Sequence, residues 1–256
     1  MRFEKFEDLL DQDLSWRKRE ISELYMLAQR ENKEVLLKSL ILLLYAHWEG
    51  YIKKASKLYL VYVSYKNIPV DRLSENFRAI MLRNHISNCL ERSEDFTLEN
   101  ELTFIKMYEK ASQKFKVDVS VDDDMEASLI DTKHNLKDKI FRRIIRILGL
   151  HYKPSLETKK NYIDLHLLAN RNSIGHGSAF NQVEQQEFTL SISDIGKLKA
   201  IIIQIIDSFR DELLAYADQE LYLLTNSAKR EAYENDREAY LQKEFKVIES
   251  LYRDEK

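Results

Sequence analysis

Apolar residues recur at spacings of three and four through most of the chain, which is the period of an amphipathic α-helix. A first long helix is predicted over 1–33, with apolar positions at Phe3, Phe6, Leu9, Leu10, Leu14, Ile21, Leu24, Tyr25 and Leu27. A second is predicted over 33–65, and its centre, 36–46, is apolar on nearly all sides, as in a helix buried within a bundle. Pro69 ends it, because proline disfavours helical geometry in the residue before it.

The later segments are also mainly helical. Helical patterns follow within 70–119, 134–150 and 162–170, and a strongly apolar helix is capped by Ser193 or Asp194. Short alternating stretches at 117–121 and 188–192 are typical of a brief strand or an exposed loop.

These elements predict an all-α protein, an antiparallel helical bundle with extra helices and at most a very short β element. We expect one domain over 1–225, with a helical insertion at about 70–120. The remaining residues, 226–256, are mostly charged, and we expect a helical extension that either projects or forms an oligomer contact.

Composition agrees with a helical fold and limits the function. Only 5 Gly and 2 Pro occur in 256 residues, so there is little turn chemistry. The net charge of −3 excludes a chain that coats nucleic acid nonspecifically, so any nucleic-acid contact must be local. Cys89 is the single cysteine, which favours a reducing compartment. The charged N-terminus and the absence of an apolar run near ~18 residues predict a cytoplasmic protein without a membrane span.

One stretch, Asn170-Arg171-Asn172-Ser173-Ile174-Gly175-His176-Gly177, joins a fixed cation, a group that titrates near neutral pH and two glycines. It is predicted to lie at a helix end and in the turn that leaves it. Three interpretations are open: a helix C-terminus whose glycines adopt positive φ, phosphate chemistry by Arg171 and His176, or phosphate or nucleotide binding without turnover.

The motif from Arg171 to His176 resembles the Arg-x4–6-His motif of the HEPN superfamily, compact helical proteins of which many are RNases of bacterial conflict systems. A second block, residues 40–52 with Trp48 and Glu49, resembles the early helix of its MAE-type nuclease branch. Together the two blocks imply a HEPN-like bundle over roughly 20–215.

The resemblance implies a metal-independent endoribonuclease that needs no cofactor. His176 would move the proton of a 2′-hydroxyl, Arg171 would stabilise the charge on the phosphate, and Asn172 can orient either group. Because one histidine cannot serve both faces of one phosphate, we expect a homodimer with a composite cleft. The rival interpretation is a non-catalytic nucleotide- or RNA-binding or regulatory dimerisation module.

A toxin or phage-defence role, with RNA as substrate and an antitoxin or regulatory protein encoded nearby, is also implied by the resemblance. Members silenced by a nucleotidyltransferase antitoxin often carry a tyrosine after the histidine. Gly177 and Ser178 stand there instead, which puts that mode of control in doubt.

Supporting residues are predicted on two other helices. Glu49 is expected either to be structural or to hold Arg171 through a bidentate pair. The basic residues of 134–150 are either a solvated face or a patch that contacts RNA phosphates: Lys139, Arg142, Arg143 and Arg146. His166 is left out of the predicted site, and no metal site is predicted, since the aspartates at 122–124 lack calcium-loop spacing.

Overall fold

The computed structural model describes residues 1–90, 99–109, 113–121, 129–133, 135–175, 177 and 191–252. For residues 84–90, 100 and 107 it describes the backbone alone.

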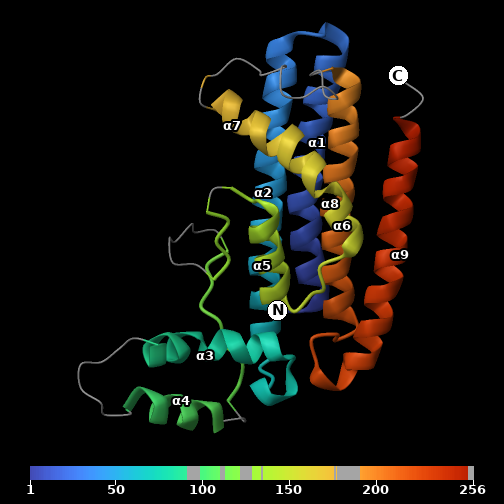
Figure 1. Cartoon of the computed structure of the whole chain (residues 1–256). Helices are drawn as coiled ribbons and strands as arrows, with labels where there is room; N and C mark the ends of the chain where they lie inside the picture. The colour runs from blue at the N-terminus through green and yellow to red at the C-terminus, as the bar shows by residue number, and fades with distance from the viewer. Residues whose placement is uncertain are drawn as a thin grey trace.

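Three long helices form the central bundle (Figure 1). α1 (Phe3–Glu31) and α2 (Glu34–Tyr65) are antiparallel and are joined at Asn32, which has the left-handed φ of 47°. α8 (Ile192–Asp218) packs against both. The long helices predicted at the start of the chain are therefore confirmed to within two residues. α8 begins earlier than expected, because its N-cap is Ser191, whose hydroxyl accepts a hydrogen bond from the Asp194 backbone N–H.

α2 is the core helix of this bundle. Leu40, Ile41, Leu44 and Ile52 are fully buried on it. By length and composition α2 is the one described helix that is apolar enough to cross a membrane, although 50% of that window is buried within the protein. The prediction that no run approaches this length was therefore wrong. Burial against α1 and α8 accounts for part of this apolar composition.

A second layer crosses α2. It consists of α5 (Asp138–Leu148), α6 (Pro154–Ile163), the π-helix η2 (Asp164–Leu168) and α7 (Ala169–Gly175). α5 ends at Gly149, whose φ of 76° allows the chain to turn, as predicted. Both α5 and α7 pack directly against α2, and Figure 1 shows α7 lying obliquely across it.

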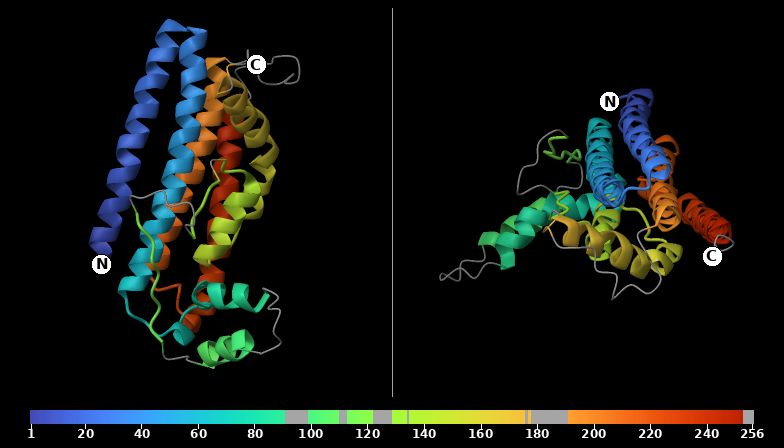
Figure 2. Two further views of the ribbon diagram at one scale, coloured as in Figure 1. Left: turned by 90° about the vertical axis from the view of Figure 1, so that its left-hand side faces the viewer. Right: turned by 90° about the horizontal axis from the view of Figure 1, so that it is seen from above.

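The residues of the predicted insertion contribute two helices at one end of the bundle, and the first of them packs against α5. After the 3-10 turn η1 (Val70–Arg72), α3 (Glu75–Leu90) and α4 (Glu99–Glu109) pack against each other and extend sideways (Figure 2). The described residues contain no sheet, only isolated bridges between Pro69 and Lys114 and between Leu73 and Leu223. The predicted all-α class is confirmed. Residues 117–121 form no strand, and most of 188–192 lies outside the described residues.

The C-terminal helix packs on its own bundle. After the 3-10 turn η3 (Leu224–Asn226), α9 (Ser227–Leu251) lies along α8 and α6 and buries Leu241, Phe245 and Ile248. Neither expectation, a projecting helix or an oligomer contact, allowed for this packing. Residues 226–256 are mostly charged, and sequence reasoning therefore missed the apolar stripe of Leu241, Phe245 and Ile248, whose spacings are four and three.

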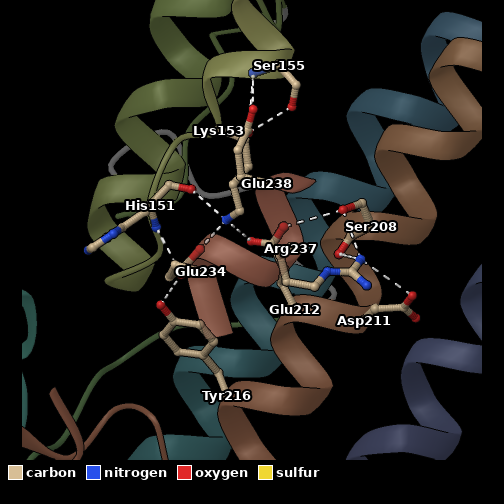
Figure 3. A network of polar contacts seen from close by, with 10 residues as sticks. All are labelled: His151, Lys153, Ser155, Ser208, Asp211, Glu212, Tyr216, Glu234, Arg237 and Glu238. Carbon is tan, nitrogen blue, oxygen red and sulfur yellow. Dashed lines mark hydrogen bonds and ion pairs between the residues drawn. The ribbon is translucent and has the colours of Figure 1, made fainter. Parts of the chain in front are cut away.

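A buried polar network joins α9 to the rest of the chain (Figure 3). Lys153 Nζ lies 3.0 Å from Glu212 Oε2 of α8, pairs with Glu234 of α9, and donates to the His151 carbonyl oxygen at 3.0 Å. The Tyr216 hydroxyl donates to Glu234. Burial raises the pKa of Glu212 to about 6, and the Glu234 carboxylate adds to the shift although Lys153 opposes it.

Candidate functional site

Six motif residues, Asn170 to Gly175, lie on the last turns of α7, and Gly177 lies in the turn that follows, so the motif is at a helix end as predicted. α7 continues through Arg171, Asn172, Ser173, Ile174 and Gly175. The helix therefore does not end at Asn170, as the sequence had suggested. The apolar side chain of Ile174 packs against the core and keeps this last turn in contact with the bundle. Only Gly177 has a positive φ, of 73°, so glycine backbone freedom is required at one of the two motif glycines.

A π-helical turn immediately before α7 sets the direction of the motif. In η2 the backbone N–H of Ala169 donates to Asp164, five residues earlier, so one extra residue is accommodated. Within this irregular turn, the backbone carbonyl oxygen of His166 accepts a hydrogen bond from Asn170 Nδ2 at 2.9 Å, so a side chain satisfies this buried acceptor. The extra residue rotates the residues that follow it about the helix axis. The face that Arg171 occupies is therefore not the one that a regular helix would give.

Arg171 is half-buried between α7 and α2. Its guanidinium carbon lies 4.4 Å from the centroid of the Tyr45 ring, a cation–π distance. Its Nη1 donates to the neighbouring Asn172 Oδ1 at 2.8 Å. Asn172, predicted to orient the histidine or the phosphate, therefore contacts the arginine directly.

Tyr45 is itself held in place. Its side chain is buried, and its hydroxyl oxygen accepts a hydrogen bond from the Leu136 backbone N–H at 3.0 Å. Burial raises the pKa of the Tyr45 phenol far above its ordinary value. The Glu49 carboxylate adds to this shift, while the Leu136 N–H and the Arg171 guanidinium oppose it. The phenol is therefore neutral at all physiological pH values.

Glu49 lies one helical turn after Tyr45 on α2. Its Oε1 atom is buried and has no hydrogen-bond partner in the part of the chain that the structure describes. The expected bidentate pair with Arg171 is not among the contacts described. Both groups instead act on the phenol of Tyr45.

His176 lies outside the described residues, as do 178–190. The described part of the motif is therefore Asn170 to Gly175 together with Gly177.

The four basic residues of α5 separate into two kinds. Arg142 Nε donates to Asp138 Oδ2 at 2.7 Å, its guanidinium also pairs with Glu157 of α6, and it stacks 3.8 Å from the centroid of Tyr152. Arg143 donates to the carbonyl oxygen of Asp131. Lys139 and Arg146 are exposed.

These positions also differ in their place along α5. The start of the helix follows Leu136, whose N–H reaches Tyr45, so Lys139 lies at the end of α5 nearer the motif. The other end lies against α3, because Asn76 Nδ2 donates to the Ile147 carbonyl at 2.9 Å. Arg146 is therefore at the end away from Arg171.

The block around Trp48 divides between two faces of α2. Trp48 is buried and makes an edge contact with Phe141 of α5. His47 faces α1 instead, with Nε2 3.0 Å from Glu20 Oε2, and burial together with the Arg17 guanidinium lowers the pKa of its imidazole. Gly50 leaves room for Arg17, because a Cβ there would lie 2.7 Å from Arg17 Nη1. His47 and Gly50 thus serve the α1–α2 contact.

Sequence reasoning missed Tyr45. It stands in the apolar run of α2, where an aromatic residue is ordinarily a core residue, and it is one. The available signal was its spacing of four before Glu49, which places both side chains on one face of the helix.

Comparison with known families agrees with this architecture. A family model, that of the MAE_28990-like HEPN family, matches residues 6–222. The chain therefore belongs to the HEPN superfamily. No curated protein matches, and neither does any solved structure. The described residues contain no group of three or more His, Cys, Asp or Glu side chains arranged to hold a metal ion.

Proposed function

We propose that this protein is a metal-independent endoribonuclease of HEPN type. The observation that carries the proposal is the match to a HEPN family over residues that include Arg171, in the Arg-x4-His spacing, on a helix packed against the core. HEPN domains are frequently RNases. The Arg171 guanidinium is oriented by Tyr45 and Asn172, two neutral groups.

The reaction would begin with attack of a ribose 2′-oxygen on the adjacent phosphorus. His176 takes the 2′-hydroxyl proton, the 2′-oxygen–phosphorus bond forms, and the bond to the 5′-oxygen of the next nucleotide breaks. Arg171 stabilises the negative charge on the non-bridging oxygens, to which its planar fork is matched. The products are a 2′,3′-cyclic phosphate end and a 5′-hydroxyl end.

The leaving 5′-oxygen needs a proton from the opposite side of the phosphate. A second copy of the chain, related by a two-fold axis, would supply it from its own His176. We therefore propose a homodimer with both motifs in one cleft. A role as a toxin or defence effector in the cytoplasm, controlled by a protein encoded nearby, belongs to the same proposal.

The test is cleavage of a mixed RNA pool in the presence of EDTA by the wild type, Arg171→Ala and His176→Ala. Cyclic-phosphate or 3′-phosphate ends that disappear in both variants would support the proposal. A folded wild-type dimer that cleaves no RNA would overturn it in favour of a binding or regulatory module. Equal activity in all three proteins would also overturn it, because the activity would then not depend on the motif.

A further inference from the structure

We propose that Tyr45 is a positioning residue for Arg171, in which the face of the ring orients the guanidinium toward the scissile phosphate. This inference rests on the proposed function for the identity of the ligand, an RNA phosphodiester. It names a residue on α2 that acts through a contact with α7 rather than by touching the substrate.

The geometry separates the two ends of the Tyr45 side chain. The ring face lies 4.4 Å from the guanidinium carbon of Arg171, whereas the hydroxyl oxygen is occupied by the Leu136 N–H at 3.0 Å. The ring therefore contacts the motif, and the hydroxyl secures residues 135–137, which lead into α5. Since Tyr45 is buried and bonded at its far end, its ring is a fixed surface.

An aromatic surface suits this task better than a carboxylate. A carboxylate binds a guanidinium edge-on and uses the N–H groups that recognise phosphate. An aromatic ring instead contacts the guanidinium face and attracts the cation through its quadrupole, so the edges keep their donors. Arg171 thus has its plane fixed by stacking and one edge oriented by Asn172 Oδ1.

The same chain offers a comparison for this assignment. Arg142 also stacks on a tyrosine, Tyr152, but its edges are taken by the carboxylates of Asp138 and Glu157. Stacking alone therefore does not identify a functional arginine. The assignment to Tyr45 depends on stacking together with the place of Arg171 in the HEPN motif.

The decisive comparison uses Tyr45→Phe, Tyr45→Leu and the control Tyr51→Leu. Phe keeps the ring and removes the hydroxyl, whereas Leu removes the ring. Tyr51 is a buried tyrosine of the same helix, so its replacement by Leu deletes the same atoms at a position where none of the described motif residues stacks on the ring. Thermal unfolding of each variant shows how much of any effect is loss of fold.

Cleavage kinetics give the first readout. We expect Tyr45→Leu to lower kcat by roughly 3- to 30-fold, the range of one cation–π contact, with a smaller change in KM. Tyr45→Phe should stay within about 3-fold of the wild type, and Tyr51→Leu should keep wild-type kcat. Equal kcat in the two Leu variants, or equal losses in Tyr45→Phe and Tyr45→Leu, would overturn the proposal.

A spectroscopic readout tests the contact without any catalysis. A guanidinium stacked on a ring has side-chain proton resonances shifted upfield by the ring current. In protein with labelled arginine, the Arg171 Nε–Hε signal, assigned by its loss in Arg171→Lys, should keep this shift in Tyr45→Phe and lose it in Tyr45→Leu. A signal that does not move in Tyr45→Leu would overturn the contact itself.

Failure of the proposed function is recognised separately. If the wild type cleaves no RNA, binding of a 2′-O-methyl RNA oligomer, followed by fluorescence anisotropy, replaces cleavage. Tyr45→Leu should then weaken binding roughly 3- to 30-fold, and Arg171→Ala at least as much. A wild type that neither cleaves nor binds would overturn both proposals, even if the resonance shift were present.

Discussion

Two buried or half-buried cations are held in this protein in opposite ways. Lys153, at the junction of α6, α8 and α9, lies between the carboxylates of Glu212 and Glu234, and only 3% of its side chain is exposed. Arg171, at the junction of α7 and α2, contacts the Tyr45 ring and the Asn172 amide oxygen. Two carboxylates hold the first cation, whereas an aromatic ring and an amide oxygen are among the contacts of the second.

Under the proposed function, this difference separates a structural cation, Lys153, from a cation that binds RNA, Arg171. A buried ammonium between two carboxylates is more than neutralised, and its role is to hold three segments together. An aromatic ring and an amide orient a guanidinium without cancelling its charge. Arg142 belongs with Lys153 by this criterion, since Asp138 and Glu157 both pair with it.

The largest effect should come from removing the structural cation. Lys153→Met would leave Glu212 and Glu234 together in the interior without a counter-charge. We expect the free energy of unfolding to fall by about 3–5 kcal/mol, as for other buried pairs that lose one partner. Urea unfolding at pH 7 measures it.

The matched control for this loss is Lys18→Met. Lys18 pairs with Asp207 at 2.5 Å, but 38% of the lysine side chain and 33% of the aspartate are exposed. An exposed pair contributes about 0–1 kcal/mol. If the two variants lost similar stability, the Lys153 network would not be the anchor of α9.

The second-largest effect should come from replacing Arg171, which should lower cleavage activity and leave stability unchanged. Arg171→Lys keeps the charge but loses the planar fork, so it should lower cleavage roughly 10²–10³-fold, the cost of losing one preorganised charge-stabilising donor. The melting temperature should stay within about 2 °C of the wild type. Arg30→Lys, at a position 74% exposed on α1, serves as the control. A stability loss comparable to that of Lys153→Met would place Arg171 among the structural cations.

A smaller effect is the pH dependence of stability that Glu212 of the Lys153 network should cause. The pKa of Glu212 is raised to about 6 in the folded protein from 4.5, so its favourable contribution is present below pH 4.5 and lost as pH rises through 6. Glu212→Gln removes this dependence. Between pH 4.5 and 6.5 the wild type should therefore lose about 1.5 kcal/mol relative to the variant, since 1.36 kcal/mol corresponds to one pKa unit and part of the titration lies below pH 4.5. Parallel stability curves would show that Glu212 ionises with an ordinary pKa.

The same two regions show what sequence could and could not predict. Helix periodicity located α1 and α2 because their apolar stripes are long and no proline interrupts either helix. It did not locate the Lys153 network, because buried charges look like surface charges until α8 and α9 pack together. The Tyr45–Arg171 contact was also out of reach. It joins two residues that are far apart in the chain, and the π-helical turn before α7 changes the direction of the Arg171 side chain. The apolar spacing of the sequence did not reveal this turn.

The smallest effect tests whether the criterion extends to α5. Lys139 is exposed and lies nearer the motif, whereas Arg142 is committed to Asp138 and Glu157. If Lys139 contacts an RNA phosphate, Lys139→Gln should reduce the slope of log affinity against log salt by about 0.7, the value for one contact with a single strand, and leave stability unchanged. Arg142→Gln should do the reverse, with a lower melting temperature and the wild-type slope. Affinities for a 2′-O-methyl RNA oligomer at several salt concentrations measure both slopes. A slope change in Arg142→Gln alone would show that pairing with carboxylates does not remove an arginine from the RNA surface, and the distinction between Lys153 and Arg171 would then not extend to the rest of the protein.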